Sequence, residues 1–287
     1  MSKTSSELQG KVAVITGGSR GLGLAIARTY AQAGAAVVIA SRSQASVEKA
    51  VAELQSEGAQ AAGLSVDVAN PAQVADLRAL ALDRFGQLDI WVNNAGLSAP
   101  FGPTVSVEPD RFVSVVNTNI LGTYHGSMTA MQHFLGQNQG KLINLLGMGS
   151  DKPVARQNAY ASSKAWIRNF TLALAEEYKE TGIGIFAFNP GLVLTEMIGQ
   201  VQAVAGFEEK VRPLETVTRL WANPADVPAA QALWLASAAT DGKTGLEKTV
   251  LTRTAVVSGI AAEGVRRLLR RPSPTPPLEV ESVPSAV

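Results

Sequence analysis

Cysteine is absent from this chain, and histidine is nearly so: only His125 and His133 occur among 287 residues. The absence of cysteine excludes disulfides, thiol catalysis and thiolate metal sites. Because metal sites in proteins draw heavily on cysteine and histidine ligands, no metal site is expected, and both histidines are interpreted as structural.

An excess of either charge and a long apolar run are also missing. The formal net charge is +1, which gives no electrostatic reason to expect a nucleic-acid partner. No stretch approaches the roughly 20 apolar residues of a membrane-spanning helix. The opening "MSKTSSELQ" (1–9) lacks the apolar centre of a signal peptide. We therefore expect a flexible tail at 1–9 and a soluble, cytoplasmic protein.

What the chain does have is an alternation of short apolar strands with helical patterns, and 46% hydrophobic residues to build a core. Continuous apolar strands that alternate with helices predict a parallel sheet covered on both faces. The expected fold is a single α/β domain at 10–252 with a doubly wound, Rossmann-type sheet. The expected strands are 11–18, 35–41, 61–68, 88–96, 141–147 and 183–191, with a long helix at about 109–135.

The motif "TGGSRGLG" (16–23) lies between the first expected strand and its helix. Glycines in this context permit a tight turn, close backbone approach and close helix–strand packing. The helix N-terminus then offers free N–H groups to a pyrophosphate. The expected cofactor-binding residues of this turn are Gly17, Ser19, Arg20, Gly21, Leu22 and Gly23.

The second expected strand ends in "ASRS", which places Ser41 and Arg42 where proteins that bind NAD usually carry an acidic residue. Without a carboxylate, nothing there repels a ribose 2′-phosphate. The planar fork of Arg42 can pair with that phosphate, and Arg20 can approach it from the glycine turn. The pattern favours NADP(H) over NAD(H).

Six motifs in order resemble the short-chain dehydrogenase/reductase family over about residues 8–250. They are "TGGSRGLG", "VDV" (66–68), "NNAG" (93–96), "NILG" (119–122), "YASSK" (160–164) and "PGLVLT" (190–195). The resemblance implies that Tyr160 is the general acid or base. It implies that Lys164 binds the nicotinamide ribose and lowers the pKa of Tyr160, and that Asn119 holds a water near Lys164. The cofactor contacts that it implies are Asp67, Val68, Asn94, Ala95, Gly96, Tyr160, Lys164, Pro190, Gly191, Val193 and Thr195.

The sequence departs from the family pattern thirteen residues before Tyr160, where a serine is usual and Gly147 stands instead. That serine would hold the substrate oxygen. Three alternatives are open: Ser150 substitutes for it, a backbone N–H of Met148 or Gly149 does so, or turnover is lost. The stretch "NLLGMGS" (144–150) is also similar to the chlorophyll b reductase branch of the family.

Residues 192–222 are expected to form a lid that sets substrate specificity. Its predicted apolar helical face contains Met197, Ile198, Val201, Val204 and Phe207. Together with Leu97, Pro100, Phe101 and Met148, this face predicts an apolar pocket, and so a hydrophobic substrate. An amphipathic helix is expected at 253–271 and a disordered, Pro-rich tail at 272–287. The altered end leaves a homodimer and a homotetramer equally open.

These patterns together predict an NADP(H)-dependent oxidoreductase that interconverts a small-molecule carbonyl and an alcohol. The alternative is a degenerate family member that senses or binds a dinucleotide with little turnover, which Gly147 and the altered end favour. Turnover, rather than cofactor binding, distinguishes the two.

Overall fold

The computed structural model describes residues 6–195, 199–252 and 278–287, together with residues 259, 261, 263, 266 and 269. The expected helix at 253–271 therefore lies almost entirely outside the described residues, as do Met197 and Ile198.

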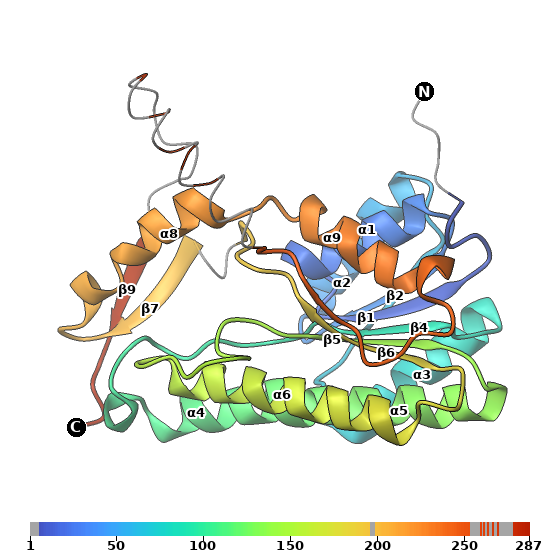
Figure 1. Ribbon diagram of the computed structural model, residues 1–287, viewed down its shortest axis with the longest axis horizontal. Coiled ribbons are helices and arrows are strands. Elements are labelled where there is room, and N and C mark those ends of the chain that lie inside the picture. Colours follow the sequence, from blue (N-terminus) through green and yellow to red (C-terminus); the bar gives the residue numbers. More distant parts are fainter. Residues whose placement is uncertain are drawn as a thin grey trace.

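A seven-stranded parallel sheet forms the centre of the molecule (Figure 1). Its spatial order is β3-β2-β1-β4-β5-β6-β8, so the chain reverses direction across the sheet after β3. All five residues of β1 are buried, which explains the continuous apolar run seen in the sequence. The strands are β1 (Val12–Thr16), β2 (Ala36–Ser41), β3 (Ala61–Ser65), β4 (Ile90–Asn93), β5 (Lys141–Leu145), β6 (Gly184–Asn189) and β8 (Glu247–Thr249).

Helices cover both faces of this sheet (Figure 1). One face packs against α1 (Gly21–Gln32), α2 (Gln44–Ser56) and α9 (Asp226–Ala236). The other packs against α3 (Pro71–Phe85), α5 (Gly122–Gln137) and α6 (Asn158–Glu177). The remaining helical segments are η1 (Thr104–Ser106), α4 (Pro109–Val115), η2 (Val116–Leu121), η3 (Glu208–Lys210), α8 (Pro213–Trp221) and η4 (Ala238–Thr240). The doubly wound fold predicted from the sequence is confirmed.

Local chemistry sets several element boundaries. The side chain of Asn70 accepts a hydrogen bond from the Ala72 backbone N–H at 3.0 Å, and Pro71 follows at the first position of α3. The same helix ends at Gly86, whose φ of 76° suits glycine. The long helix expected at about 109–135 is present as one helical run from Pro109 to Gln137, in which the π-helical η2 joins α4 to α5.

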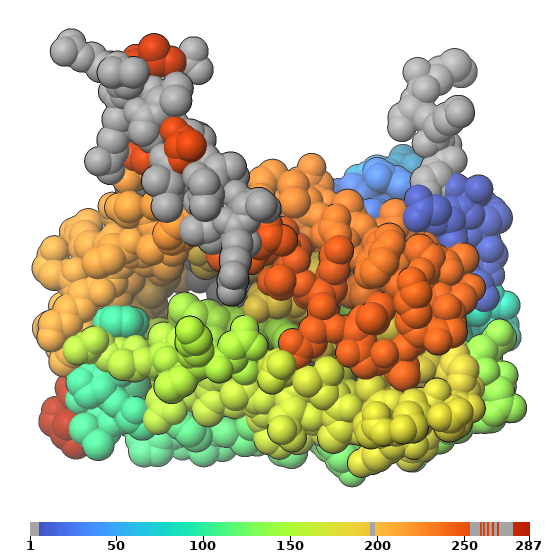
Figure 2. Space-filling model, in the orientation of Figure 1, coloured from blue at the N-terminus to red at the C-terminus, as the bar shows by residue number. Residues whose placement is uncertain are grey.

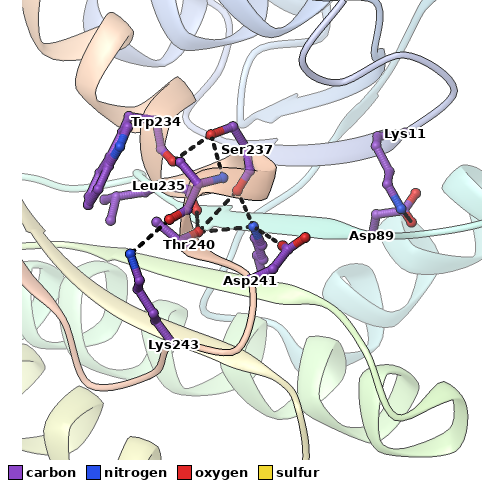
Figure 3. Close-up of polar contacts among 10 residues, drawn as sticks. Lys11, Asp89, Trp234, Leu235, Ser237, Thr240, Asp241 and Lys243 are labelled. Atoms are coloured by element: carbon purple, nitrogen blue, oxygen red, sulfur yellow. Dashed lines mark hydrogen bonds and ion pairs between the residues drawn. The ribbon is translucent and has the colours of Figure 1, made fainter.

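At the amino-terminal ends of the strands, opposite the glycine turn, Lys141 begins the interior strand β5. Lys141 Nζ donates to Thr240 Oγ1 at 2.9 Å and pairs with Asp241 Oδ1 at 2.8 Å. It also donates to the Ser237 carbonyl, and burial lowers its pKa. Figure 3 shows Ser237, Thr240 and Asp241 gathered around this contact, which holds η4 against the sheet.

Two predictions for the second half of the chain are wrong. A second, two-stranded parallel sheet pairs β7 (Gln200–Val204) with β9 (Glu279–Val283). Val201 and Val204 therefore lie in a strand and not on a helical face, because backbone pairing overrides their helical spacing. Residues 279–283, expected to be disordered, are ordered by the same pairing. The short strand β8 was not expected either, and its three residues are exposed or half-buried.

Among the described residues, no helix combines the length and hydropathy that crossing a bilayer requires. The same residues contain no group of His, Asp and Glu side chains placed to hold a metal ion.

Candidate active site

Tyr160 and Lys164 lie one turn apart on α6, at the edge of the sheet where β5 ends. The buried Lys164 ammonium donates a hydrogen bond to the Leu145 carbonyl at 2.9 Å. Lys164 Nζ lies 5.6 Å from the centre of the Tyr160 ring. The i,i+4 spacing read from the sequence therefore brings the two side chains together beside the last residue of β5.

Asn119 joins this group from η2, where it is completely buried. Its side-chain oxygen accepts from the Leu97 backbone N–H at 2.8 Å, and its amide donates to the Leu97 carbonyl at 3.0 Å and to Ser163 Oγ at 2.9 Å. A Cβ added to Gly96 would lie 3.6 Å from Asn119 Oδ1 and 3.8 Å from Lys164 Nζ. Asn119 and Lys164 therefore flank the same glycine after β4, and the π-helical segment turns Asn119 inward.

Gly147 lies directly beneath the Tyr160 hydroxyl. A Cβ added there would lie 2.4 Å from that hydroxyl oxygen and 3.5 Å from Lys164 Cε. Gly149, with φ of 99°, is equally constrained, because its Cβ would lie 2.4 Å from Ala161 Cα. The two glycines let the start of α6 approach the β5–α6 loop more closely than residues with side chains would allow. The phenol thus occupies the space that a serine side chain at position 147 would need.

The Ser150 hydroxyl forms hydrogen bonds with the backbone of Gly147. Its Oγ donates to the Gly147 carbonyl at 2.6 Å and accepts from the Gly147 backbone N–H at 3.2 Å. The hydroxyl is buried and braces the loop that supports Tyr160. In this arrangement the hydrogen bonds of Ser150 are made to the loop backbone.

Burial shifts the pKa values of both Tyr160 and Lys164. Burial raises the pKa of Tyr160 to about 12, whereas the sequence interpretation has Lys164 lowering it. Burial also lowers the pKa of Lys164 to about 8. Desolvation by burial causes both shifts, and the Lys164 ammonium donates its hydrogen bond to the Leu145 carbonyl.

The glycine turn has the close contacts that its motif predicts. A Cβ on Gly23 would lie 2.2 Å from the Gly17 carbonyl oxygen, and one on Gly17 would lie 2.9 Å from Ala95 Cα. The Asn94 amide donates to the Thr16 and Gly17 carbonyls at 3.0 and 3.1 Å. The first N–H groups of α1 follow directly after this turn. Its narrow backbone is the kind of cradle that a dinucleotide pyrophosphate requires.

Two further observations fit a dinucleotide. A Cβ on Gly21 would lie 3.2 Å from Thr195 Cγ2, so the glycine turn and the segment after β6 face each other, as the resemblance implies. At the end of β2, the buried Ser41 Oγ has no hydrogen-bond partner among the described residues, and the neighbouring Arg42 is exposed.

The other expected cofactor contacts differ in how far they are exposed to solvent. Asp67 is exposed and accepts a hydrogen bond from the Ala69 N–H at 3.0 Å. The Val68 side chain is buried, and its carbonyl meets His125 Nδ1 at 3.1 Å. Pro190 and Val193 are buried after β6, and Val193 forms a parallel bridge with Asn223. His125 therefore has a structural contact, as interpreted from the sequence.

The structure adds site residues that the sequence reasoning did not single out. Thr16 Oγ1 accepts from the Asn94 and Ala95 N–H groups at 3.1 Å each, so it joins the ends of β1 and β4. Ser163 fixes the Asn119 amide, and its own hydroxyl donates to the Tyr160 carbonyl at 2.7 Å. Both lie inside recognised motifs, and that position was the only signal for them.

Comparison with known proteins assigns the class. The family model for short chain dehydrogenases matches residues 11–205. The chain therefore belongs to the short-chain dehydrogenase/reductase family, a class of oxidoreductases that use a nicotinamide dinucleotide, as its six motifs predict.

Relatives with different substrates match the chain. A 3beta-hydroxysteroid dehydrogenase from Eggerthella lenta is 35% identical over 237 residues, with 80% of this chain and 88% of the relative covered. A probable chlorophyll(ide) b reductase from Oryza sativa is 36% identical over 206 residues, with 64% of this chain covered. The match spans only 40% of that relative's length.

Solved structures match the fold over most of the chain. The 3-ketoacyl-(acyl-carrier-protein) reductase from Brucella melitensis, complexed with NADH, is 29% identical with a TM-score of 0.75, covering 85% of this chain and 97% of that one. An actinorhodin polyketide ketoreductase with NADPH is 25% identical with a TM-score of 0.76, covering 84% and 95%. One neighbour carries NADH and the other NADPH.

Proposed function

We propose that this protein is an NADP(H)-dependent oxidoreductase that interconverts a carbonyl and an alcohol on a hydrophobic small molecule. The observation that carries the proposal is the convergence of Tyr160, Lys164 and Asn119 at the end of β5, beside the Gly96 backbone. The glycine turn supports the cofactor, and the class of the relatives supports the reaction type.

Tyr160 is the proton donor in the reductive direction. With a pKa of about 12 it remains a neutral phenol at neutral pH, which is the protonation state that can donate to a developing alkoxide. When bound, a nicotinamide dinucleotide supplies the hydride. Lys164, held by the Leu145 carbonyl, carries a proton whose pKa lies near 8, so it can pass one on to Tyr160 after turnover. Asn119 holds the loop at Leu97 in place beside them.

The preference for the phosphorylated cofactor rests on Arg42 and Arg20, together with the absence of an acidic residue after β2. Arg42 follows the last residue of β2 and is exposed. A guanidinium binds a phosphate group through paired hydrogen bonds. We propose a hydrophobic substrate because apolar side chains, those of Leu97, Phe101 and Met148, are expected to line its pocket. Met148 is 49% exposed, so its side chain is accessible to a ligand.

The second hydrogen-bond donor to the substrate oxygen is proposed to be the Met148 backbone N–H. The Ser150 hydroxyl is occupied by the Gly147 backbone, and Gly147 has no side chain. Backbone N–H groups serve well as fixed donors to a developing oxyanion. Ser150 then acts by holding the loop in shape.

The test is oxidation of NADPH with a panel of aliphatic, aromatic and cyclic ketones, comparing the native protein with Tyr160→Phe. The hydroxyl is the only atom lost, so the fold is retained and turnover is expected to fall by about 10² or more. Tyr178→Phe, at the opposite end of α6 and outside the site, is the matched control. Equal rates for Tyr160→Phe and the native protein would refute the assignment. Dinucleotide binding without turnover on any substrate would favour the sensor alternative.

A further inference from the structure

Strand β7 is held on both of its edges. On one edge β9 pairs with it over five residues, from Gln200 opposite Glu279 to Val204 opposite Val283. On the other edge the Phe101 N–H donates to the Gln202 carbonyl at 2.8 Å, and the Val204 N–H donates to the Phe101 carbonyl at 2.9 Å. Because two strands alone are only marginally stable in water, the order of β7 depends on these neighbours.

Side chains reinforce the β7–β9 pairing. Gln202 Nε2 donates to Glu281 Oε2 at 2.9 Å. Ser282 Oγ donates to Glu208 Oε1 at 2.6 Å, and this hydrogen bond lowers the pKa of Glu208. These contacts bind β9 to both β7 and η3.

The chain after β9 continues the attachment. The Ala286 N–H donates to the Ser106 carbonyl at 3.1 Å, so residues 278–287 also reach η1. In Figure 2 their dark red atoms lie against the blue-green atoms that precede and begin α4, at one end of the molecule. Residues 278–287 therefore join two segments that are far apart in the sequence.

An apolar contact lies under this attachment. Val283 and Pro284 form one wall of a cavity of about 140 Å³, whose other lining residues are Pro100, Val107, Val204, Ser106, Glu108 and Arg111. Val204 itself is only 1% exposed. An aspartate in place of the half-buried Val283 would remove this apolar contact and put a carboxylate into a lining that also contains Glu108 and Arg111.

A short path leads from β7 to the catalytic tyrosine. A Cβ on Gly102 would lie 2.5 Å from Val204 Cγ2, so β7 packs directly on the backbone after Phe101. The Gly102 N–H donates to the Arg156 carbonyl at 3.0 Å, and Arg156 has a positive φ of 67°. Ser98 Oγ donates to Gln157 Oε1 at 3.3 Å. Arg156 and Gln157 lead directly into α6, whose third residue is Tyr160.

We propose that residues 278–287 are a strap that positions β7 and the 97–102 loop beside Tyr160, with Val283 as its main positioning residue. The strap therefore determines how firmly the carbonyl substrate is held, which rests on the function proposed above. The glycine turn and Arg42 belong to other segments. The strap is expected to affect the substrate and leave dinucleotide affinity unchanged.

The kinetic test compares Val283→Asp with Val287→Asp and with a variant lacking residues 278–287. Val287 is 84% exposed, so the same substitution in the same segment serves as the matched control. Because a misplacement of about 1 Å can cost on the order of 10² in rate, kcat/KM should fall by about tenfold to a hundredfold for Val283→Asp and for the deletion. KM for the carbonyl should rise, while the dissociation constant of NADPH should stay within about twofold.

Hydrogen exchange tests the strap without any turnover. The amides of Phe101 and of β7 should exchange faster in Val283→Asp and in the deletion variant, and at the native rate in Val287→Asp. A synthetic peptide of residues 278–287, added to the deletion variant, should restore protection. If the native protein proved inactive but these amides lost protection, the proposed function would fail and the strap would stand. Native protection in both altered variants, or NADPH affinity that weakens as much as KM rises, would overturn the strap.

Discussion

Replacing Gly147 by serine restores the hydroxyl that the family usually carries, yet here it should reduce activity. The added Cβ would lie 2.4 Å from the Tyr160 hydroxyl oxygen and 3.2 Å from Cζ. The Gly147 N–H and carbonyl are both bonded to Ser150, which restrains the loop. The phenol is therefore the group that must move.

The size of the effect follows from that contact. Ordinary van der Waals contact begins near 3.4 Å, so the hydroxyl must shift by about 1 Å. A misplacement of about 1 Å at a reacting group can cost on the order of 10² in rate, or about 3 kcal/mol of transition-state stabilisation. Gly147→Ser should therefore lower kcat by about a hundredfold, with little change in NADPH affinity.

The assay is steady-state oxidation of NADPH with the best ketone of the panel. Gly147→Ala shares the added Cβ but lacks the hydroxyl, so it separates the steric effect from any benefit of a new donor. Gly136→Ala in α5, whose Cβ would meet no atom within 4 Å, controls for a glycine-to-alanine change as such. Equal or higher kcat in Gly147→Ser than in the native protein would show that the phenol moves freely, and the steric reasoning would be wrong.

Three further predictions follow from the site. Folding lowers the pKa of Lys164 from 10.5 to about 8 in the protein without dinucleotide. Between these two pH values the unfolded chain binds more protons than the folded one. The free energy of unfolding should therefore rise with pH across this window, by up to about 3 kcal/mol. Tyr160 opposes this only above pH 10, where the unfolded chain loses its phenol proton first. Urea titrations between pH 7.5 and 10 should therefore show a rise that is smaller in Lys164→Met, where the lowered pKa of Lys141 still contributes; parallel curves would contradict it. Arg42→Ala should weaken NADPH binding about tenfold and leave NADH binding unchanged, measured by fluorescence titration, whereas equal losses for both would remove Arg42 from the phosphate site. Ser150→Ala removes the two side-chain hydrogen bonds to Gly147, keeps the backbone bond from the residue 150 N–H to the Gly147 carbonyl, and should lower kcat about tenfold through a loosened loop; a native kcat would show that the side-chain bonds are dispensable.

Much of the fold and of the site was readable from the sequence, because local rules govern both. Buried parallel strands need apolar side chains on both faces, so β1 and β2 appear as nearly continuous apolar runs. The i,i+4 spacing alone places Tyr160 and Lys164 on one face of α6. The glycine turn needs residues without side chains at positions 17 and 23, and no other residue type fits those contacts.

The β7–β9 sheet was missed because its pairing joins residues 200–204 to residues 279–283, almost 80 positions apart along the chain. Val201 and Val204 have helical spacing, and nothing local to them indicates that a strand partner exists. Pairing at such a separation is decided by tertiary packing. The Pro-rich composition of residues 272–287 predicted disorder, but proline is tolerated beside an edge strand such as β9.

The sequence by itself determined the doubly wound fold, the glycine turn and the Tyr160–Lys164 pair, since each follows from periodicity or from motifs of a few residues. Only the tertiary structure decided where the Ser150 hydroxyl bonds, that the Tyr160 phenol fills the space above Gly147, and that residues 278–287 hold β7. Those three facts depend on which distant backbones come within contact, and the spacing of residues along one chain does not encode that distance.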